Sequence, residues 1–163
     1  PHLGHLEVIQ QTIISLNIDE LIVVPAFLNP FKSHSIAPAK LRLQWLKEMT
    51  KDLPHTQVSS FEIEQNRPVP SIETIRHFYE DRSIYLIIGA DNLEKLEQWK
   101  EFETLDSMVE WVVATRDDIP IPDNYLRLKV DQDISSSTLR TEIKKEYLYP
   151  PLADEILKYY QDH

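Results

Sequence analysis

The sequence predicts an α/β domain with a doubly wound parallel sheet. Short apolar strand patterns alternate with helical patterns along the whole chain. The most apolar runs, Leu21–Pro25 and Tyr85–Ile88, show no polar alternation, which is typical of parallel strands covered on both faces. With 163 residues, of which 42% are apolar, the chain has the size and composition of one globular unit. We therefore expect a single domain over residues 1–163.

The first part of the chain carries a helix, a buried strand, a second helix and a second strand. Apolar side chains recur every three or four residues over Leu3–Leu16, which predicts a helix. Glu20–Pro25 is a short apolar run ended by proline, which indicates a buried strand. A proline-containing loop, residues 26–38, leads to an amphipathic helix over Ala39–Met49. Gln57–Ile63 alternates loosely between polar and apolar residues and is predicted to be a strand.

The alternation continues to the end of the chain. Prolines bracket a turn over Asn66–Pro70, and Ser71 is placed to cap a helix that runs to about Glu80. Ser83–Ile88 is a buried strand that ends in Gly89. The remaining predicted elements are one or two short helices over Asn92–Leu105, a strand over Val109–Ala114, a loop over Arg116–Asn124, a strand over Leu126–Val130, a helix from Ser135 to about Lys145 and a terminal helix over Asp154–Gln161.

The composition excludes several classes of partner. The 27 acidic residues outnumber the 17 lysines and arginines, and a formal charge of −10 disfavours non-specific binding to nucleic acid. An anionic ligand would need a local cluster of cations or donors. No apolar run is long enough to span a bilayer, and we expect no signal peptide, because no basic-then-apolar leader is seen before Pro1. The absence of cysteine excludes disulfides and thiolate sites and agrees with a cytoplasmic location. We expect no nucleic-acid or membrane partner, and a homo-oligomer is left open.

The first candidate site is the opening pentapeptide, Pro-His-Leu-Gly-His. On a helix His2 and His5 would share a face, and Gly4 would let a bulky group approach the backbone. Proline suits a first helical turn, and a helix N-terminus adds free N–H groups and partial positive charge. These features favour a phosphate site. A surface helix that happens to carry two histidines is the plain alternative, and a zinc pair is a weaker one.

The second candidate is the segment Ile134-Ser135-Ser136-Ser137-Thr138-Leu139-Arg140. Several hydroxyl groups open a predicted helix, and Arg140 follows one turn later, which forms a second anion cradle. Ordinary N-capping would need only one of the three serines.

Three weaker candidates lie in loops or at element ends. Gly89 allows close approach at the end of a strand, and Asp91 could accept hydrogen bonds from a ribose, although a turn with an aspartate cap would look the same. Lys32 lies in the loop Asn29–His34 and could contact phosphate, although most lysines are simply solvated. Trp99 could stack on a flat ring, although tryptophan is more often part of a core. The chain has no P-loop, Gly-x-Gly-x-x-Gly or Gly-x-Ser-x-Gly motif.

These motifs resemble those of the nucleotidylyltransferases. His2-Leu3-Gly4-His5 is similar to the His-x-Gly-His signature of that family, and Ile134–Arg140 to its Ile-Ser-Ser-Thr-x-x-Arg signature, with Ser137 in the threonine place. Further segments resemble the bacterial nicotinate-nucleotide adenylyltransferase branch. They are Val24-Pro25, Asn29-Pro30-Phe31-Lys32, Pro70-Ser71-Ile72-Glu73-Thr74, Ile87-Ile88-Gly89-Ala90-Asp91, Trp99 and Val113-Ala114-Thr115-Arg116.

The resemblance implies a Rossmann-like fold and a reaction. Members begin with a strand and a Gly-Gly-Ser/Thr-Phe-Asp-Pro loop before the first signature, so that strand is expected to be missing from residues 1–163. The implied reaction is attack of the phosphate of nicotinate mononucleotide on ATP, giving nicotinate adenine dinucleotide and pyrophosphate in NAD biosynthesis. Phosphopantetheine or nicotinamide mononucleotide as the acceptor remains an alternative, as does a nucleotide-binding regulatory module without catalysis.

The resemblance also implies a role for each candidate residue. His2, His5 and Arg140 would be catalytic, and His2, Gly4 and His5 would meet the ATP phosphates together with Ile134, Ser135, Ser136, Ser137 and Arg140. Gly89 and Asp91 would meet the adenosine, with Arg116 near the adenine. Lys32, Ser71 and Trp99 would bind nicotinate mononucleotide, with Trp99 stacked on the pyridine ring and Ser71 near its carboxylate. Mg²⁺ would be held mainly by the substrate phosphates, with no metal site on the protein.

Overall fold

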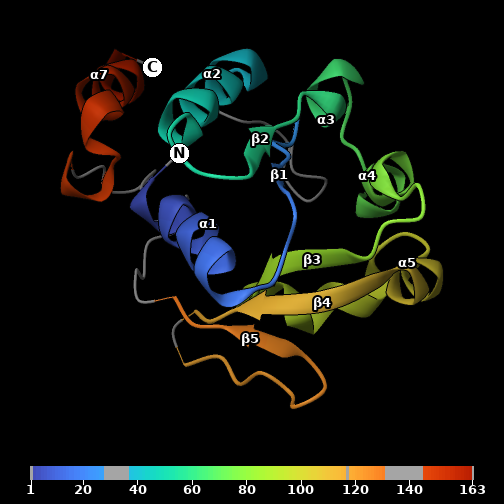
Figure 1. The fold of residues 1–163 in the computed structure, drawn as a ribbon. Coiled ribbons are helices and arrows are strands. Elements are labelled where there is room, and N and C mark those ends of the chain that lie inside the picture. The colour runs from blue at the N-terminus through green and yellow to red at the C-terminus, as the bar shows by residue number, and fades with distance from the viewer. Residues whose placement is uncertain (1, 28–36, 117, 131–144, 163) are drawn as a thin grey trace. The chain divides into compact units, whose positions relative to one another are not determined.

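The computed structural model describes residues 2–27, 37–116, 118–130 and 145–162. The chain divides into two compact units, coloured along the sequence in Figure 1. Unit 1 comprises residues 1–68 and 131–163, and unit 2 comprises residues 69–130. Each unit combines helices with a parallel sheet, so the predicted α/β class is confirmed. The described strands form one sheet in each unit, because β1 pairs only with β2 whereas β3 begins a separate ladder.

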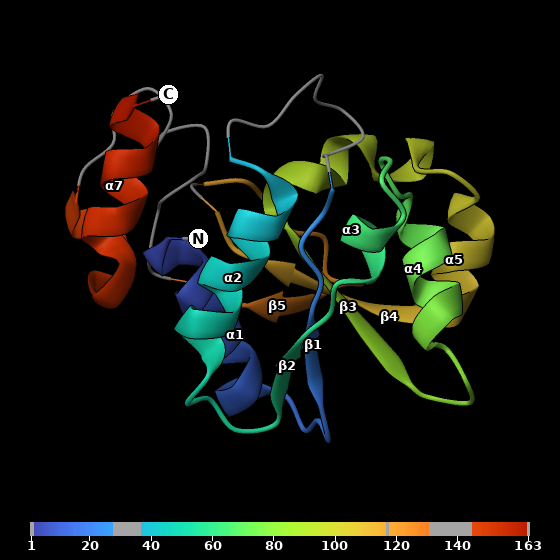
Figure 2. The ribbon, with the colours of Figure 1, turned by 90° about the horizontal axis from the view of Figure 1, so that it is seen from above.

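Unit 1 opens with α1 (Leu3–Ser15), followed by β1 (Leu21–Val23). The strand β1 pairs in parallel with β2 (Thr56–Val58), in a register that sets Leu21 opposite Thr56. The helix α2 (Ala39–Thr50) connects the two strands, as parallel pairing requires (Figure 2). The predicted first helix, buried strand and amphipathic helix are therefore confirmed.

The C-terminal part of unit 1 packs on α2. It consists of the short 3₁₀ helices η2 (Lys145–Tyr147) and η3 (Pro150–Leu152), followed by α7 (Ala153–Asp162). Trp45 of α2 is 2% exposed, and its indole Nε1 donates a 2.9 Å hydrogen bond to Oε1 of Glu155. The ring of Tyr159 meets Trp45 edge-on, with the centroids 5.9 Å apart. The predicted terminal helix is confirmed, and its apolar face lies against α2.

The predicted strand Gln57–Ile63 is wrong in its second half. β2 ends at Val58, and a short helix, α3 (Phe61–Glu64), follows. The N–H of Ser59 makes the last ladder bond, at 2.8 Å to the carbonyl of Val23. The Oγ of Ser59 then accepts the N–H of Phe61 at 3.2 Å, which turns the chain into the helix. Apolar alternation alone does not detect this serine turn.

Unit 2 contains a three-stranded parallel sheet in the order β3-β4-β5. Its strands are β3 (Ile84–Gly89), β4 (Val109–Ala114) and β5 (Leu126–Leu128), so the three predicted strands are confirmed. β4 lies in the middle of this sheet, and its Val112 and Val113 are fully buried. This central position explains why β4 lacks polar alternation over its last residues.

The helices of unit 2 are α4 (Ser71–Phe78), the 3₁₀ helix η1 (Ala90–Gln98) and α5 (Phe102–Met108). They fit the predicted helix after Ser71 and the prediction of one or two short helices over Asn92–Leu105. The expectation that Ser71 caps α4 is wrong, because Pro70 is the N-cap residue and no side chain caps the helix. The carbonyl of Pro70 accepts the N–H of Glu73 at 3.0 Å, so Ser71 is already the first helical residue.

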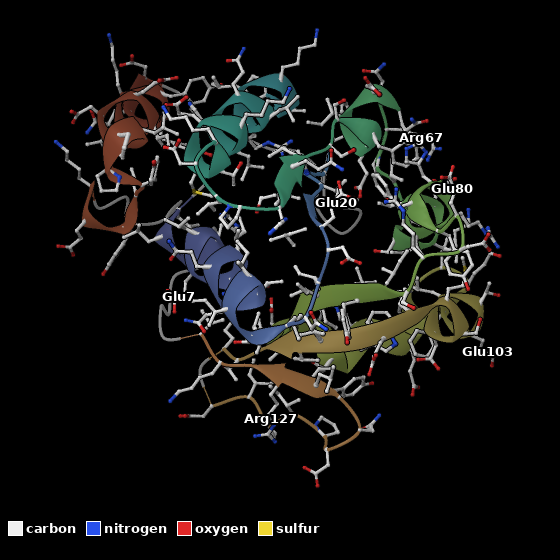
Figure 3. The ribbon with its side chains drawn as sticks, viewed as in Figure 1. Glu7, Glu20, Arg67, Glu80, Glu103 and Arg127 are labelled. Atoms are coloured by element: carbon white, nitrogen blue, oxygen red, sulfur yellow. The ribbon has the colours of Figure 1, made fainter. Side chains whose placement is uncertain are left out.

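Charged side chains cover much of the surface. Figure 3 labels Glu80 and Glu103, which are both exposed side chains of unit 2. Within the described ranges, no helix combines the length and the apolarity that a membrane span requires.

Candidate active site

The two histidines of the first signature form a reciprocal cap at the start of α1. His2 is the N-cap residue, with extended backbone angles (φ −133°, ψ 174°). Its N–H donates to Nδ1 of His5 at 3.2 Å, and the N–H of His5 donates to Nδ1 of His2 at 3.3 Å. The rings stack with centroids 3.8 Å apart and an interplanar angle of 18°. The expectation that both histidines lie on one helix face is wrong for the backbone of His2, but the cap still brings the rings together.

These hydrogen bonds define the proton positions on both rings. A ring nitrogen that accepts an N–H bond cannot carry a proton itself. Each Nδ1 is therefore unprotonated, and each neutral ring carries its proton on Nε2. The exposed His5 thus offers an Nε2–H group, the kind of donor that a phosphate oxygen requires.

Burial separates the two histidines. His2 is 4% exposed and Gly4 is buried, whereas His5 as a whole residue is exposed. The pKa of His5 lies well below its usual value, first because protein atoms displace water around its ring and then because a charged His2 would repel it. Both causes lower the pKa of His5. His5 is therefore neutral at pH 7.

We expect the lowered pKa of His5 to make the protein less stable in mild acid. The unfolded chain binds more protons than the folded chain between the folded pKa of His5 and about 6.5. Stability from this group is therefore complete above about pH 6.5 and declines as the pH falls through that window. Thermal unfolding between pH 5 and pH 8 would measure it in the native protein and in His5→Gln. A slope below pH 6.5 that is equally steep in the variant would contradict the assignment.

The end of β3 brings together three of the predicted residues. Gly89 ends the strand, and η1 begins directly after it. Nη1 of Arg116, which follows β4, lies 3.1 Å from Oδ2 of Asp91 in a partly exposed ion pair. Sequence reasoning missed Asn92, whose Nδ2 donates to the carbonyl of Gly89 at 3.1 Å. Its position directly after Gly-Ala-Asp, at the end of a strand, is the sequence signal that could have indicated this residue.

Gly89 leaves space for the side chain of Asp91, whereas its backbone angles do not call for glycine. Its φ of −74° is open to any residue, but an added Cβ would lie 2.6 Å from Oδ1 of Asp91. The Asp91 carboxylate therefore occupies the space above Gly89. Any larger residue there must displace that carboxylate and disturb its pair with Arg116.

The two predicted ring-binding residues of unit 2 lie at element ends. Trp99 is the C-cap residue of η1 and is half-buried. It meets Trp111 edge-on at a centroid distance of 6.1 Å, so part of the ring belongs to the core. Ser71 is half-buried at the start of α4. Trp99 thus packs against the core without being fully buried.

Several predicted site residues lie outside the described residues. They are Lys32, Ile134, Ser135, Ser136, Ser137 and Arg140, and the predicted helix from Ser135 to about Lys145 lies there as well. The flanks of both segments are nevertheless described.

Arg42 of α2 holds the chain on both sides of residues 28–36. Its guanidinium donates to the carbonyls of Ala26 at 2.7 Å, Phe27 at 2.8 Å and Ala37 at 3.1 Å. Sequence reasoning missed Arg42, because one arginine on an amphipathic helix carries no signal of its partners. Beyond residue 144, Leu148 forms an isolated antiparallel bridge with His2. Both contacts lie within unit 1, at described residues that flank the two segments.

Among the residues that the structure describes, no three His, Asp or Glu side chains lie together as a metal-binding group.

The comparisons with known proteins agree with one another. A family model described as cytidylyltransferase-like matches residues 1–142. A probable nicotinate-nucleotide adenylyltransferase of Sulfurimonas denitrificans is 47% identical over 163 residues, covering 99% of this chain and 90% of the relative. A protein of the same description from Campylobacter jejuni is 43% identical, covering 99% of this chain and 91% of the relative.

Solved structures share the fold. The nicotinic acid mononucleotide adenylyltransferase of Plasmodium falciparum complexed with NaAD superposes with a TM-score of 0.76. The two sequences are 20% identical, and the match covers 98% of this chain and 91% of the other. At this identity the likeness supports the Rossmann-like fold alone.

Proposed function

The chain belongs to the cytidylyltransferase-like family, and within it to the nicotinate-nucleotide adenylyltransferases; from that premise we propose how its residues carry out the reaction. The enzyme transfers the adenylyl group of ATP to nicotinate mononucleotide, a step in NAD biosynthesis. The products are nicotinate adenine dinucleotide and pyrophosphate. The observation that carries the proposal is the reciprocal cap, in which His2 and His5 stack and each Nδ1 accepts a backbone N–H at the start of α1.

The chemistry requires no protein nucleophile or base. An oxygen of the mononucleotide phosphate forms a bond to the α-phosphorus of ATP, and the bond from that phosphorus to the bridging oxygen breaks. The electron pair leaves on pyrophosphate. Because the attacking group is already an anion, the protein contributes alignment and charge stabilisation. His2 and His5 donate to the phosphate oxygens as charge builds, and Gly4 lets the phosphate approach the backbone of α1.

The second signature holds the leaving group in this proposal. Ile134 and the Ser135–Ser137 segment supply backbone and hydroxyl donors to the β- and γ-phosphates. Arg140 supplies a planar cation that matches phosphate oxygens in pairs. Lys32 adds a further positive charge for the phosphate of the mononucleotide.

Residues of unit 2 bind the adenosine and the pyridine ring in this proposal. Gly89 and Asp91 meet the adenosine, with Arg116 near the adenine; their mutual packing supports this grouping. Trp99 stacks on the pyridine ring, which agrees with its half-buried position, and Ser71 lies near the nicotinate carboxylate. The family model runs across both units, so we count residues 1–163 as one nucleotidylyltransferase domain.

Mg²⁺ enters as part of the ATP substrate in this proposal. It is held by phosphate oxygens and water, as Mg²⁺ commonly is at nucleotide sites. The bound ion would neutralise charge on the phosphates, while His2 and His5 orient them. We further propose a cytoplasmic location, with which the absence of cysteine agrees.

We expect Gly89→Ala to raise the KM for ATP about fivefold to tenfold. The new methyl group would displace the Asp91 carboxylate from the end of β3, so the adenosine would lose a partner. Steady-state kinetics with varied ATP would measure the effect. In an Asp91→Ala background the same substitution should have almost no further effect, since the clash is then gone. An equal rise in KM in both backgrounds would show that Gly89 acts independently of Asp91.

Labelled oxygen tests the proposed direct attack. Nicotinate mononucleotide would carry ¹⁸O in its three terminal phosphate oxygens, and mass spectrometry would follow the products. We expect all of the label in the dinucleotide and none in pyrophosphate. Label in pyrophosphate would mean that the mononucleotide phosphorus is the one attacked, and the proposed polarity would be overturned.

A further inference from the structure

Glu101 has a constrained backbone at a position just before α5. Its φ of 52° and ψ of 41° lie in the left-handed region, which favours glycine. The N–H of Leu105 donates to its carbonyl at 2.9 Å, so this conformation starts the helix. The chain thus has a glutamate at a position where the backbone would accept glycine more easily. The side chain of Glu101 has a partner that explains this choice.

Arg76 of α4 holds the carboxylate of Glu101 with two parallel hydrogen bonds. Nη2 lies 2.9 Å from Oε1, and Nη1 lies 3.2 Å from Oε2. The pairing raises the pKa of Arg76 and lowers the pKa of Glu101, in each case chiefly through the side-chain hydrogen bond. The side chains are 49% and 41% exposed, so the pair contributes little to global stability. Its bidentate geometry fixes orientation more than it supplies energy.

The pair connects the two elements that carry the candidate ring-binding residues. Residues 99–102 form a tight turn, in which the N–H of Phe102 donates to the carbonyl of Trp99 at 3.1 Å. Glu101 lies inside this turn, which we call the Trp99 turn. Ser71 is the first residue of α4, the helix that carries Arg76. On its other side the turn rests on Trp111, which stacks with Phe102 at 6.1 Å. The Trp99 turn is therefore held by the core on one side and by Arg76 on the other.

We propose that Arg76 and Glu101 are positioning residues for the acceptor site, which fix the Trp99 turn against α4 and thereby set the affinity for nicotinate mononucleotide. This inference rests on the proposed function of Trp99 and Ser71. Neither Arg76 nor Glu101 touches a substrate in this account. Both act through the place and orientation of the Trp99 ring.

The test separates the acceptor from ATP. Arg76→Gln and Glu101→Gln should each raise the KM for nicotinate mononucleotide about threefold to fivefold, the range that one exposed ion pair can supply. The KM for ATP, the kcat and the Tm should stay close to those of the native enzyme. Lys51→Gln is the matched control, because it breaks the exposed pair with Glu48 in unit 1 and should leave both KM values unchanged.

Two further variants distinguish the ion pair from the backbone turn. Glu101→Gly keeps the left-handed turn without the carboxylate and should raise the acceptor KM as Glu101→Gln does. The exchange Arg76→Glu with Glu101→Arg restores opposite charges and should return the acceptor KM to within about twofold of native. An unchanged acceptor KM in Arg76→Gln and Glu101→Gln would overturn the proposal.

The variant Trp99→Ala distinguishes a failure of the positioning role from a failure of the proposed function. If Trp99→Ala raises the acceptor KM while the Arg76 and Glu101 variants do not, only the positioning role is overturned. If Trp99→Ala leaves the acceptor KM unchanged, the assignment of the ring site is wrong and the positioning role is overturned with it.

Discussion

His5→Gln is expected to lower kcat about 10²- to 10³-fold and to leave the Tm almost unchanged. The variant loses the Nε2–H donor that His5 offers to the phosphates, and losing one such donor commonly costs this much. His5 is the third helical residue of α1, the position at which glutamine completes a capping box. The glutamine carbonyl can therefore still accept the N–H of His2, so the helix start is retained. Steady-state pyrophosphate release and thermal unfolding would measure the two quantities.

His5→Ala is the matched comparison. It removes the donor and also the acceptor for the N–H of His2, so it should lose as much activity as His5→Gln and also about 1 kcal/mol of stability. If His5→Gln kept more than about a tenth of the native kcat, His5 would not stabilise the transition state. If instead the Tm fell by the same amount in both variants, the hydrogen bond that residue 5 accepts from His2 would not contribute to stability.

Arg140→Ala is expected to lower kcat/KM for ATP by about 10³-fold. A cation about 4 Å from a phosphate charge gains roughly 4 kcal/mol at an effective dielectric constant near 20. That energy corresponds to about a thousandfold in rate if the contact is made in the transition state. Initial rates at limiting ATP would measure the loss.

Arg140→Lys sharpens the test, because it keeps the charge and loses the planar guanidinium. We expect it to recover only part of the activity, since lysine cannot bind two phosphate oxygens in parallel. Lys129→Ala removes an exposed cation of unit 2 and should behave as native. A loss in Lys129→Ala as large as that in Arg140→Ala would indicate a general effect of charge rather than a contact with phosphate.

The strands of unit 2 show how much of the fold the sequence predicts. The predicted strand Val109–Ala114 has the same bounds as β4, and Ser83–Ile88 differs from β3 by one residue at each end. In both segments mainly apolar residues, many of them β-branched, follow one another, which is a strong local signal. Gln57–Ile63 failed because the side chain of Ser59, and not apolar periodicity, ends that strand.

Site residues could be predicted where their place along the chain, such as the end of a strand, marks them. They could not be predicted where only contacts with distant residues mark them. The end of a parallel strand is a general ligand position, so Gly89 and Asp91 were found, and Arg116 lies with them. The stacking of His2 on His5 depends on a cap outside the helix, which helical spacing does not describe. Arg42 and Arg76 act through partners far away in sequence, and neither has a local pattern.

Pyrophosphate release with three acceptors tests the central claim most directly. The native protein would receive ATP and Mg²⁺ with nicotinate mononucleotide, nicotinamide mononucleotide or phosphopantetheine in parallel. We predict the highest kcat/KM with nicotinate mononucleotide, and its loss in His5→Gln. A higher kcat/KM with either other acceptor would contradict the assignment of Trp99 and Ser71 to a nicotinate ring. If folded protein released no pyrophosphate with any of the three acceptors, the adenylyltransferase reaction itself would be contradicted.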